Sequence, residues 1–206
     1  MSNITLNHLH FSNMFSYGKT NVMRLDCNKI TQLTAPNGSG KSSIAMIIQE
    51  ILFNKNVKGI KKTDILNRWV KDKNWSGSIE FTVDGDDYGV NVQRTGASTK
   101  VKLIKNGVDI SDHKVLDTYK KIQDILGLDF EVFSQLTYQS STDRLEFLKA
   151  TDTNRKKFLI NLFNLQKYIE IGDKIKLKAS QVDRDAVKLQ GELKSIEDFL
   201  NTTVIP

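Results

Sequence analysis

Residues that usually mark secreted, metal-binding or membrane proteins are scarce in this chain of 206 residues. A single cysteine, Cys27, excludes an intrachain disulfide and a cysteine metal cluster, and suits a reducing cytoplasm. The three histidines, His8, His10 and His113, offer no convincing metal-ligand set. No run of about eighteen apolar residues occurs, and the first residues lack the basic and apolar regions of a signal peptide. We therefore expect a cytoplasmic protein without a transmembrane helix.

Basic residues outnumber acidic ones moderately, 30 Lys and Arg against 24 Asp and Glu, for a formal net charge of +6. Such a balance permits nucleic-acid binding without requiring it. Basic side chains gather between residues 54 and 75 and again between 149 and 157. A solvated lysine-rich surface is the alternative to a contact with DNA phosphates. The candidates for DNA contact are Lys55, Lys58, Lys61, Lys62 and Arg68.

A glycine-rich segment between an apolar run and a helical pattern is the strongest motif in the sequence. The run Ile30 to Leu33 predicts a buried strand, and the apolar spacing after residue 43 predicts a helix that ends near Phe53. Strand, glycine loop and helix form the setting of a phosphate-binding loop. The expected nucleotide-binding residues are Ala35, Asn37, Gly38, Ser39, Gly40, Lys41, Ser42 and Ser43.

The residue types in this loop match the chemistry of a bound triphosphate. Glycines let backbone N–H groups turn inward, and the helix that follows presents its positive end to the phosphates. Lys41 is expected to reach the β- and γ-phosphates, and the hydroxyl of Ser42 to ligate Mg²⁺. Ala35 stands where the motif usually begins with glycine, and it is small enough to fit there.

The remaining sequence predicts strands first and helices later. Alternation predicts strands over 4–11 and 22–25 and an antiparallel meander over 79–110, with a tight turn at Asn106-Gly107. Helices are expected over 113–126, with Val115, Leu116 and Tyr119 on the buried side, and from Thr153 through Ile169. Residues 130–138 suit either a strand or a helix.

The last part of the chain carries apolar residues at heptad spacing. Together they fill the a and d positions of four heptads and predict a coiled-coil strand, whose first half two alanines weaken. The alternative is an amphipathic helix packed on its own domain. The two rows are Ile175, Val182, Leu189 and Ile196, and Ala179, Ala186, Leu193 and Leu200.

Several stretches together resemble the N-terminal half of an SMC-like ABC ATPase of the SbcC type. Within that family they are similar to the large subunit of the recombination exonucleases of T4-like and T5-like phages. The resemblance implies an α/β fold, a P-loop NTPase head (lobe I) with an antiparallel β-meander and a C-terminal coiled-coil helix. It suggests a head over 1–170 and the start of a coiled coil over 171–206. The stretches are 13–18, 35–43, 57–62, 133–136, 147–148, 154–165 and Tyr168.

The family also implies cofactors, partners and further site residues. ATP with Mg²⁺ would be held between two heads, so that ATP-driven dimerisation controls the access of DNA to a partner nuclease. The implied partners are a second ATPase subunit, a two-metal nuclease subunit, double-stranded DNA and the C-terminal half of the head. Asn13 and Ser16 would lie near the nucleotide base, although Phe15 replaces a basic residue of many relatives. Gln139 would sense Mg²⁺ and the attacking water, although strict register points to Ser141.

Hydrolysis needs an acidic strand for Mg²⁺ and water, and a signature loop for the partner's γ-phosphate, and neither is found in the sequence. The nearest mimic, Ile125 to Asp129, spans an expected helix end. We therefore expect a truncated or split product that binds nucleotide without turnover. Two alternatives remain: a self-contained P-loop phosphotransferase, which needs an in-chain Mg²⁺ carboxylate, and a non-enzymatic nucleotide-binding protein that dimerises through 174–200.

Overall fold

The computed structural model describes residues 3–27, 30, 32–137, 150–163 and 165–202. The chain forms two compact units, residues 1–158 and 159–206, and the division falls inside helix α6 (Asp152–Leu162). Each unit is described by itself. The first contains a sheet with its covering helices, and the second is mostly one long helix.

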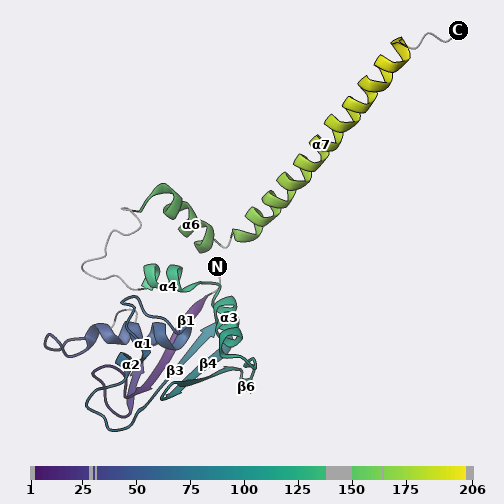
Figure 1. Ribbon diagram of the computed structural model, residues 1–206. Helices are drawn as coiled ribbons and strands as arrows, with labels where there is room; N and C mark the ends of the chain where they lie inside the picture. The colour runs from purple at the N-terminus through teal and green to yellow at the C-terminus, as the bar shows by residue number, and fades with distance from the viewer. Residues whose placement is uncertain (1–2, 28–29, 31, 138–149, 164, 203–206) are drawn as a thin grey trace. The chain divides into compact units, whose positions relative to one another are not determined.

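The first unit is built on one antiparallel sheet of six strands in the order β2-β1-β3-β4-β5-β6 (Figure 1). The strands expected over 4–11 and 22–25 and the meander are confirmed, and they share a single sheet. Every strand pair is antiparallel. The strands are β1 (Ile4–Ser12), β2 (Asn21–Arg24), β3 (Asn74–Val83), β4 (Asp86–Thr95), β5 (Ser98–Lys105) and β6 (Val108–Asp109).

Local backbone features set the register of the sheet. At the turn between β5 and β6, Asn106 and Gly107 have φ angles of 48° and 83°. Two successive positive φ angles are typical of a two-residue hairpin turn, so the predicted Asn-Gly turn is confirmed. A register shift lies between Leu6 and His8 of β1. This bulge lets Leu6 and Leu9 pack toward the same core although they are three positions apart.

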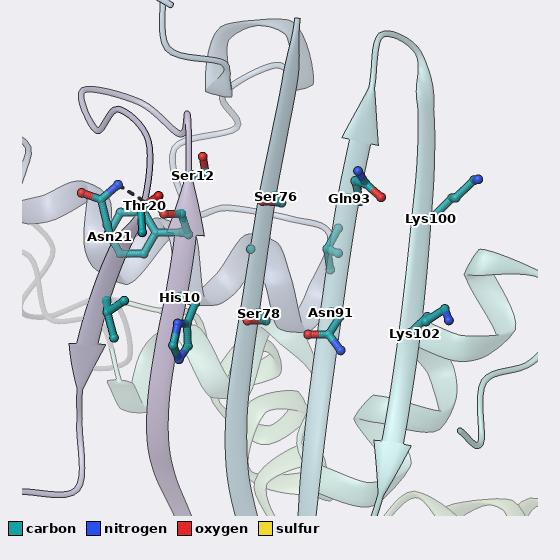
Figure 2. A pocket seen from close by; sticks show the side chains of 14 residues that line it. His10, Ser12, Thr20, Asn21, Ser76, Ser78, Asn91, Gln93, Lys100 and Lys102 are labelled. Atoms are coloured by element: carbon teal, nitrogen blue, oxygen red, sulfur yellow. Dashed lines mark hydrogen bonds between the residues drawn. The ribbon is translucent and has the colours of Figure 1, made fainter. Parts of the chain in front are cut away.

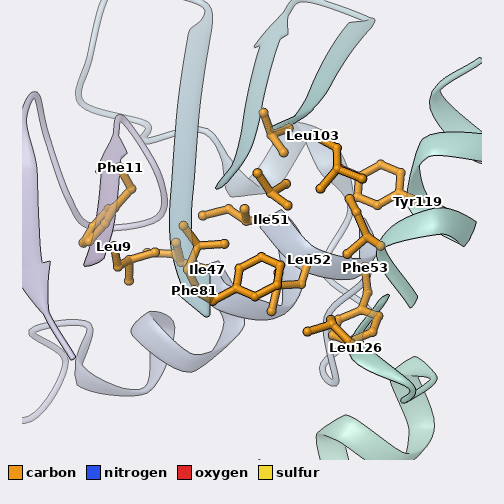
Figure 3. Packing of buried hydrophobic residues seen from close by; sticks show 14 of the residues in the cluster. Leu9, Phe11, Ile47, Ile51, Leu52, Phe53, Phe81, Leu103, Tyr119 and Leu126 are labelled. Carbon is orange, nitrogen blue, oxygen red and sulfur yellow. The ribbon is translucent and has the colours of Figure 1, made fainter. Parts of the chain in front are cut away.

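Helices α1 (Lys41–Phe53) and α3 (Val115–Leu126) pack against one face of the sheet, and α4 (Phe130–Thr137) contacts α1. Close approach of α1 depends on Gly77 of β3, because a Cβ there would lie 2.6 Å from Cδ1 of Ile51. The apolar faces of α1, the central strands and α3 thus form one core (Figure 3). The α1 helix that ends near Phe53 is confirmed, as is the helix over 113–126 with Gly127 at its end in a left-handed conformation.

Three expectations about local structure are wrong. Ile30 and Leu33 lie outside any strand and are exposed, because a buried central strand needs neighbouring strands and the described residues pair none with this segment. Leu116 of α3 is 72% exposed, since it lies one position off the buried stripe of that helix. The helix expected from Thr153 through Ile169 is two helices, since α6 ends at Leu162 and α7 begins at Gln166. Residues 130–137 are helical.

The second unit consists mainly of helix α7 (Gln166–Thr202), which has no buried residue. Both heptad rows lie on this helix, and their large apolar members remain exposed, for example Ile175 at 63% and Leu189 at 60%. The predicted helix is confirmed, and its pairing with another helix stays a prediction. None of the helices in the described ranges is long and apolar enough to span a membrane.

Candidate nucleotide-binding site

The glycine loop leads directly into the first turn of α1. Gly38 and Gly40 have φ angles of 83° and 92°, which side-chain-bearing residues rarely adopt. No side chain caps the helix at Gly40, and its first turn carries no acidic residue. The N–H of Ser43 bonds the carbonyl of Gly40 at 2.9 Å, and the other N–H groups of that turn lie at the positive end of the helix dipole. This arrangement fits an anion such as a phosphate group.

The ammonium group of Lys41 lies across the loop. Its Nζ donates hydrogen bonds to the carbonyl oxygens of Ala35, at 2.6 Å, and Pro36, at 2.9 Å. An ammonium group has three donors, so one remains for an oxygen of a ligand. Ser42, next in the chain, is exposed at the same helix end. The other predicted loop residues, Asn37, Gly38, Ser39 and Ser43, are exposed or half-buried in the same loop and helix turn.

The turn between β1 and β2 packs on the glycine loop. A Cβ at Gly40 would collide with the Oγ of Ser16, so the predicted residue Ser16 does lie against the phosphate-binding loop. The hydroxyl of Tyr17 donates a hydrogen bond to the carbonyl of Gly40 at 3.1 Å. Burial raises the pKa of Tyr17, which keeps this phenol protonated and able to donate.

Tyr17 is therefore a site residue that the sequence did not identify. Its ring also packs edge-on against Phe11, at 5.0 Å between centroids. The available signal was an aromatic residue directly beside Ser16 in a short turn. That signal does not reveal a contact with a loop 23 residues further along the chain.

Asn13 plays a different part from the one expected. It is 6% exposed, and its amide nitrogen donates to the carbonyl of Asn74 at 3.0 Å. Its backbone accepts from the N–H of Asn67, at 2.9 Å, and donates to Gly18. These bonds hold the turn to the segment before β3. They give no support to a contact between Asn13 and a nucleotide base.

The residues present fit a phosphate chain with Mg²⁺. The uncapped amides and Lys41 supply donors, and the hydroxyl of Ser42 is an oxygen ligand of the kind Mg²⁺ takes alongside water and phosphate oxygens. Among the described residues there is no group of three or more His, Cys, Asp or Glu that could hold a metal by itself. Gln139, the other expected Mg²⁺ contact, lies outside the described residues.

Within the basic segment 54–75, Lys62 is not a free surface cation, which corrects the expectation that it contacts DNA. Its Nζ bonds the carboxylate of the fully buried Glu50 and the carbonyl of Asn54. Burial, helped by the charge of Arg94, lowers the pKa of Lys62 to about 8. Lys62 and Glu50 form a salt bridge. Its role is to fasten this segment to α1.

The other predicted DNA contacts remain available. Lys58, Lys61 and Arg68 are exposed. Lys55 is exposed as well, and its ammonium lies 5.8 Å from the centre of the Phe130 ring. The segment also contains the short helix α2 (Lys62–Ile65).

The outer face of the sheet carries a hollow of about 470 Å³, which the sequence did not reveal (Figure 2). Strand register aligns two rows of side chains across β1, β3, β4 and β5. No carboxylate belongs to its described lining, and the lysines stand at one side. Alternating polar residues in the strands were the only available signal. The rows are His10, Ser78, Asn91 and Lys102, and Ser12, Ser76, Gln93 and Lys100.

A glycine loop at the start of a helix, a lysine across it and an antiparallel sheet beneath define the head of a P-loop ATPase. Comparison with known proteins agrees. A family model described as an AAA domain matches residues 8–202. The chain belongs to this AAA domain family, and its relatives show that it resembles SMC-like ATPases of the SbcC type.

Curated relatives include phage, archaeal and bacterial proteins. The chain is 44% identical over 201 residues to the probable exonuclease subunit 2 of Escherichia phage T5, covering 98% of this chain and 33% of that protein. It is 28% identical over 171 residues to the DNA double-strand break repair Rad50 ATPase of Methanococcus maripaludis, covering 83% and 17%. It is 26% identical to the SbcC component of the nuclease SbcCD of Clostridium acetobutylicum, covering 87% and 17%. The chain thus spans a third or less of the length of these relatives.

Solved structures support the same fold. One from a study of ATP-driven dimerization and DNA-stimulated activation of SMC ATPases aligns with a TM-score of 0.54 at 19% identity. It covers 76% of this chain and 98% of that one. The recombination mediator RecF aligns with a TM-score of 0.50 at 14% identity, covering 81% and 42%. At such identities the likeness defines the fold, an α/β P-loop ATPase head.

Proposed function

We propose that this chain is the ATP-binding half of the ATPase subunit of a DNA exonuclease complex that acts in double-strand-break repair and recombination. ATP with Mg²⁺ binds the loop 35–43, and ATP-driven pairing of two heads controls the access of DNA to a partner nuclease. The names of the phage, archaeal and bacterial relatives, an exonuclease subunit, a break-repair ATPase and a nuclease subunit, support this assignment. We place its action in the cytoplasm, which is the host's if a phage encodes the chain.

The observation that carries the proposal is the uncapped start of α1 beneath Lys41. Gly40 leaves the first-turn amides without a side-chain partner, and Lys41 brings a positive charge over the same loop. Together they offer charge-assisted hydrogen bonds to a phosphate chain, which are about twice as strong as neutral ones. Ser42 is the proposed Mg²⁺ ligand, and Ser16 borders the site through Gly40.

We propose that the remaining chemistry comes from outside this chain. Phosphoryl transfer needs a carboxylate for Mg²⁺ and a group that orients water. Asp84 and Asp86, two of the acidic residues of the meander, serve other purposes. Asp84 accepts a hydrogen bond from the backbone of Asn3, and Asp86 pairs with Lys105 at 2.7 Å. The C-terminal half of the head, a second ATPase subunit and a two-metal nuclease subunit are the proposed partners.

Steady-state hydrolysis by the purified chain tests this division of labour. We expect phosphate release from Mg-ATP to equal that of the Lys41→Ala variant, because the chain binds nucleotide without completing the catalytic site. Turnover that disappears in Lys41→Ala would show a complete site within this chain. It would then favour a self-contained phosphotransferase or ATPase.

A further inference from the structure

Among the described residues of the first unit, Trp69 is the most exposed large apolar one, with 92% of its surface accessible. The other tryptophan, Trp75, lies six residues further on and is 3% exposed. Tryptophan is highly buried on average, so an indole left almost wholly in water calls for an explanation. Folding of this unit does not use the Trp69 ring.

The backbone around Trp69 is nevertheless held in place. The N–H of Trp69 donates to the side-chain oxygen of Asn67 at 2.8 Å, which forms a local turn. Asn67 is 4% exposed, and its own N–H donates to the carbonyl of Asn13. Ile65, at the end of α2, is fully buried. The ring is thus presented on an ordered backbone, which lowers the entropy cost of binding a ligand.

This segment is joined to the turn that borders the nucleotide loop. The N–H of Phe15 donates to the carbonyl of Ile65 at 2.6 Å, and Met14 and Leu66 form an isolated bridge. Lys19 pairs with Asp72 at 3.2 Å. The same turn, between β1 and β2, contacts Gly40 through Ser16 and Tyr17. The Trp69 segment and the glycine loop therefore both contact this turn.

The exposed neighbours of Trp69 are charged, and most are cations. Arg68, Lys71 and Lys73 are exposed in the same stretch, and the acidic residue between them, Asp72, is paired with Lys19. A protein partner usually requires an apolar surface around such an anchor, with charged residues kept to the rim. An aromatic ring among cations instead matches single-stranded nucleic acid, whose bases stack while its phosphates bind the cations.

We propose that Trp69 is a stacking platform for an unpaired DNA base, with Arg68 and its neighbouring lysines holding the adjacent phosphates. Bases in an intact duplex stack on one another, so the indole needs an end, a frayed junction or a single strand. The inference rests on the proposed function in DNA-end processing and adds a substrate class to it. It makes this side of the head selective for DNA with unpaired bases.

Fluorescence titration of the chain with oligothymidylate, without nucleotide, tests the inference. Stacking quenches Trp69 while the buried Trp75 supplies a constant background. The variants without this indole are compared with the parent chain by the fluorescence anisotropy of labelled oligothymidylate. We expect Trp69→Ala to weaken single-strand binding about tenfold without changing its salt dependence, because the indole is uncharged. Arg68→Ala should lower the salt slope by about 0.7, and Trp69→Phe should restore part of the affinity. Leu116→Ala, at another exposed apolar site on α3, is the control.

Each outcome bears on a separate claim. Equal single-strand affinity for Trp69→Ala and the parent chain would overturn the inference, as would the same loss of affinity on a blunt duplex. Quenching by Mg-ATP with none by DNA would overturn it too and would assign the ring to the nucleotide. If the parent chain binds neither single-stranded nor duplex DNA at low salt, the proposed DNA role itself fails, and the inference fails with it.

Discussion

At the residue scale, the structure separates side chains that serve the ligand site from those that hold the fold. Lys41 and Ser42 were predicted because the phosphate-binding loop is a local motif, in which neighbouring residues supply the chemistry. The roles of Tyr17 and Glu50 were not predicted, because their hydrogen-bond partners, Gly40 and Lys62, lie 23 and 12 residues away in the sequence. The sequence predicted a DNA contact for Lys62 because it lies in a lysine-rich segment. The sequence does not reveal that a buried carboxylate lies opposite this one lysine.

The Glu50–Lys62 pair predicts a specific pattern of stability. Lys62→Met leaves the buried carboxylate without its cationic partner, with only the amide of Asn56 still bonded to it, and should destabilise the fold by about 3–5 kcal/mol in urea unfolding. Adding Glu50→Gln should recover much of that loss, because the uncompensated charge disappears. Lys61→Met, at the exposed neighbouring position, should stay within about 0.5 kcal/mol of the parent. Equal effects of the two lysine changes would show that the pair does not hold the segment.

At the element scale, strands with one buried face were predictable because their alternation records that face directly. Ile79, Phe81 and Val83 of β3 are all buried as the alternation requires. The segment Ile30 to Leu33 shows the limit of this reasoning. An apolar run indicates burial but does not show which strand it would pair with. In the described part of the chain, no strand pairs with this segment. The outer hollow escaped prediction because it depends on register across four strands.

The two heptad rows of α7 are predicted to be the surface that pairs with another helix. Replacing Ala179 and Ala186 by Leu buries additional methylene groups only if the heptad rows pack against another helix. Each leucine should then stabilise the pairing by about 2 kcal/mol. We expect the double variant to self-associate at lower concentration than the parent chain in sedimentation equilibrium. The matched control places leucines on the outer positions Ser180 and Arg184. If the control associates as strongly, the heptad rows do not define the pairing surface.

At the scale of the whole molecule, the chain combines a glycine loop, a basic segment and a long helix, α7, with no buried residue. Its relatives are about three or more times longer, since it covers 33% of the phage T5 protein and 17% of the archaeal one. The fold class was predictable because loop, meander and heptads follow one another in a distinctive order. The partners were suggested by that resemblance alone, so they remain proposals.

The central claim is that the loop before α1 binds a nucleotide through Lys41 and the uncapped amides. Isothermal titration of the chain with Mg-ATP, in parallel with Lys41→Ala, tests it most directly. Loss of the charge-assisted contact, about 1.5–3 kcal/mol, predicts saturable binding by the parent chain and an affinity lower by about tenfold to a hundredfold in the variant. No heat of binding at millimolar Mg-ATP, or equal affinity in both proteins, would contradict the account.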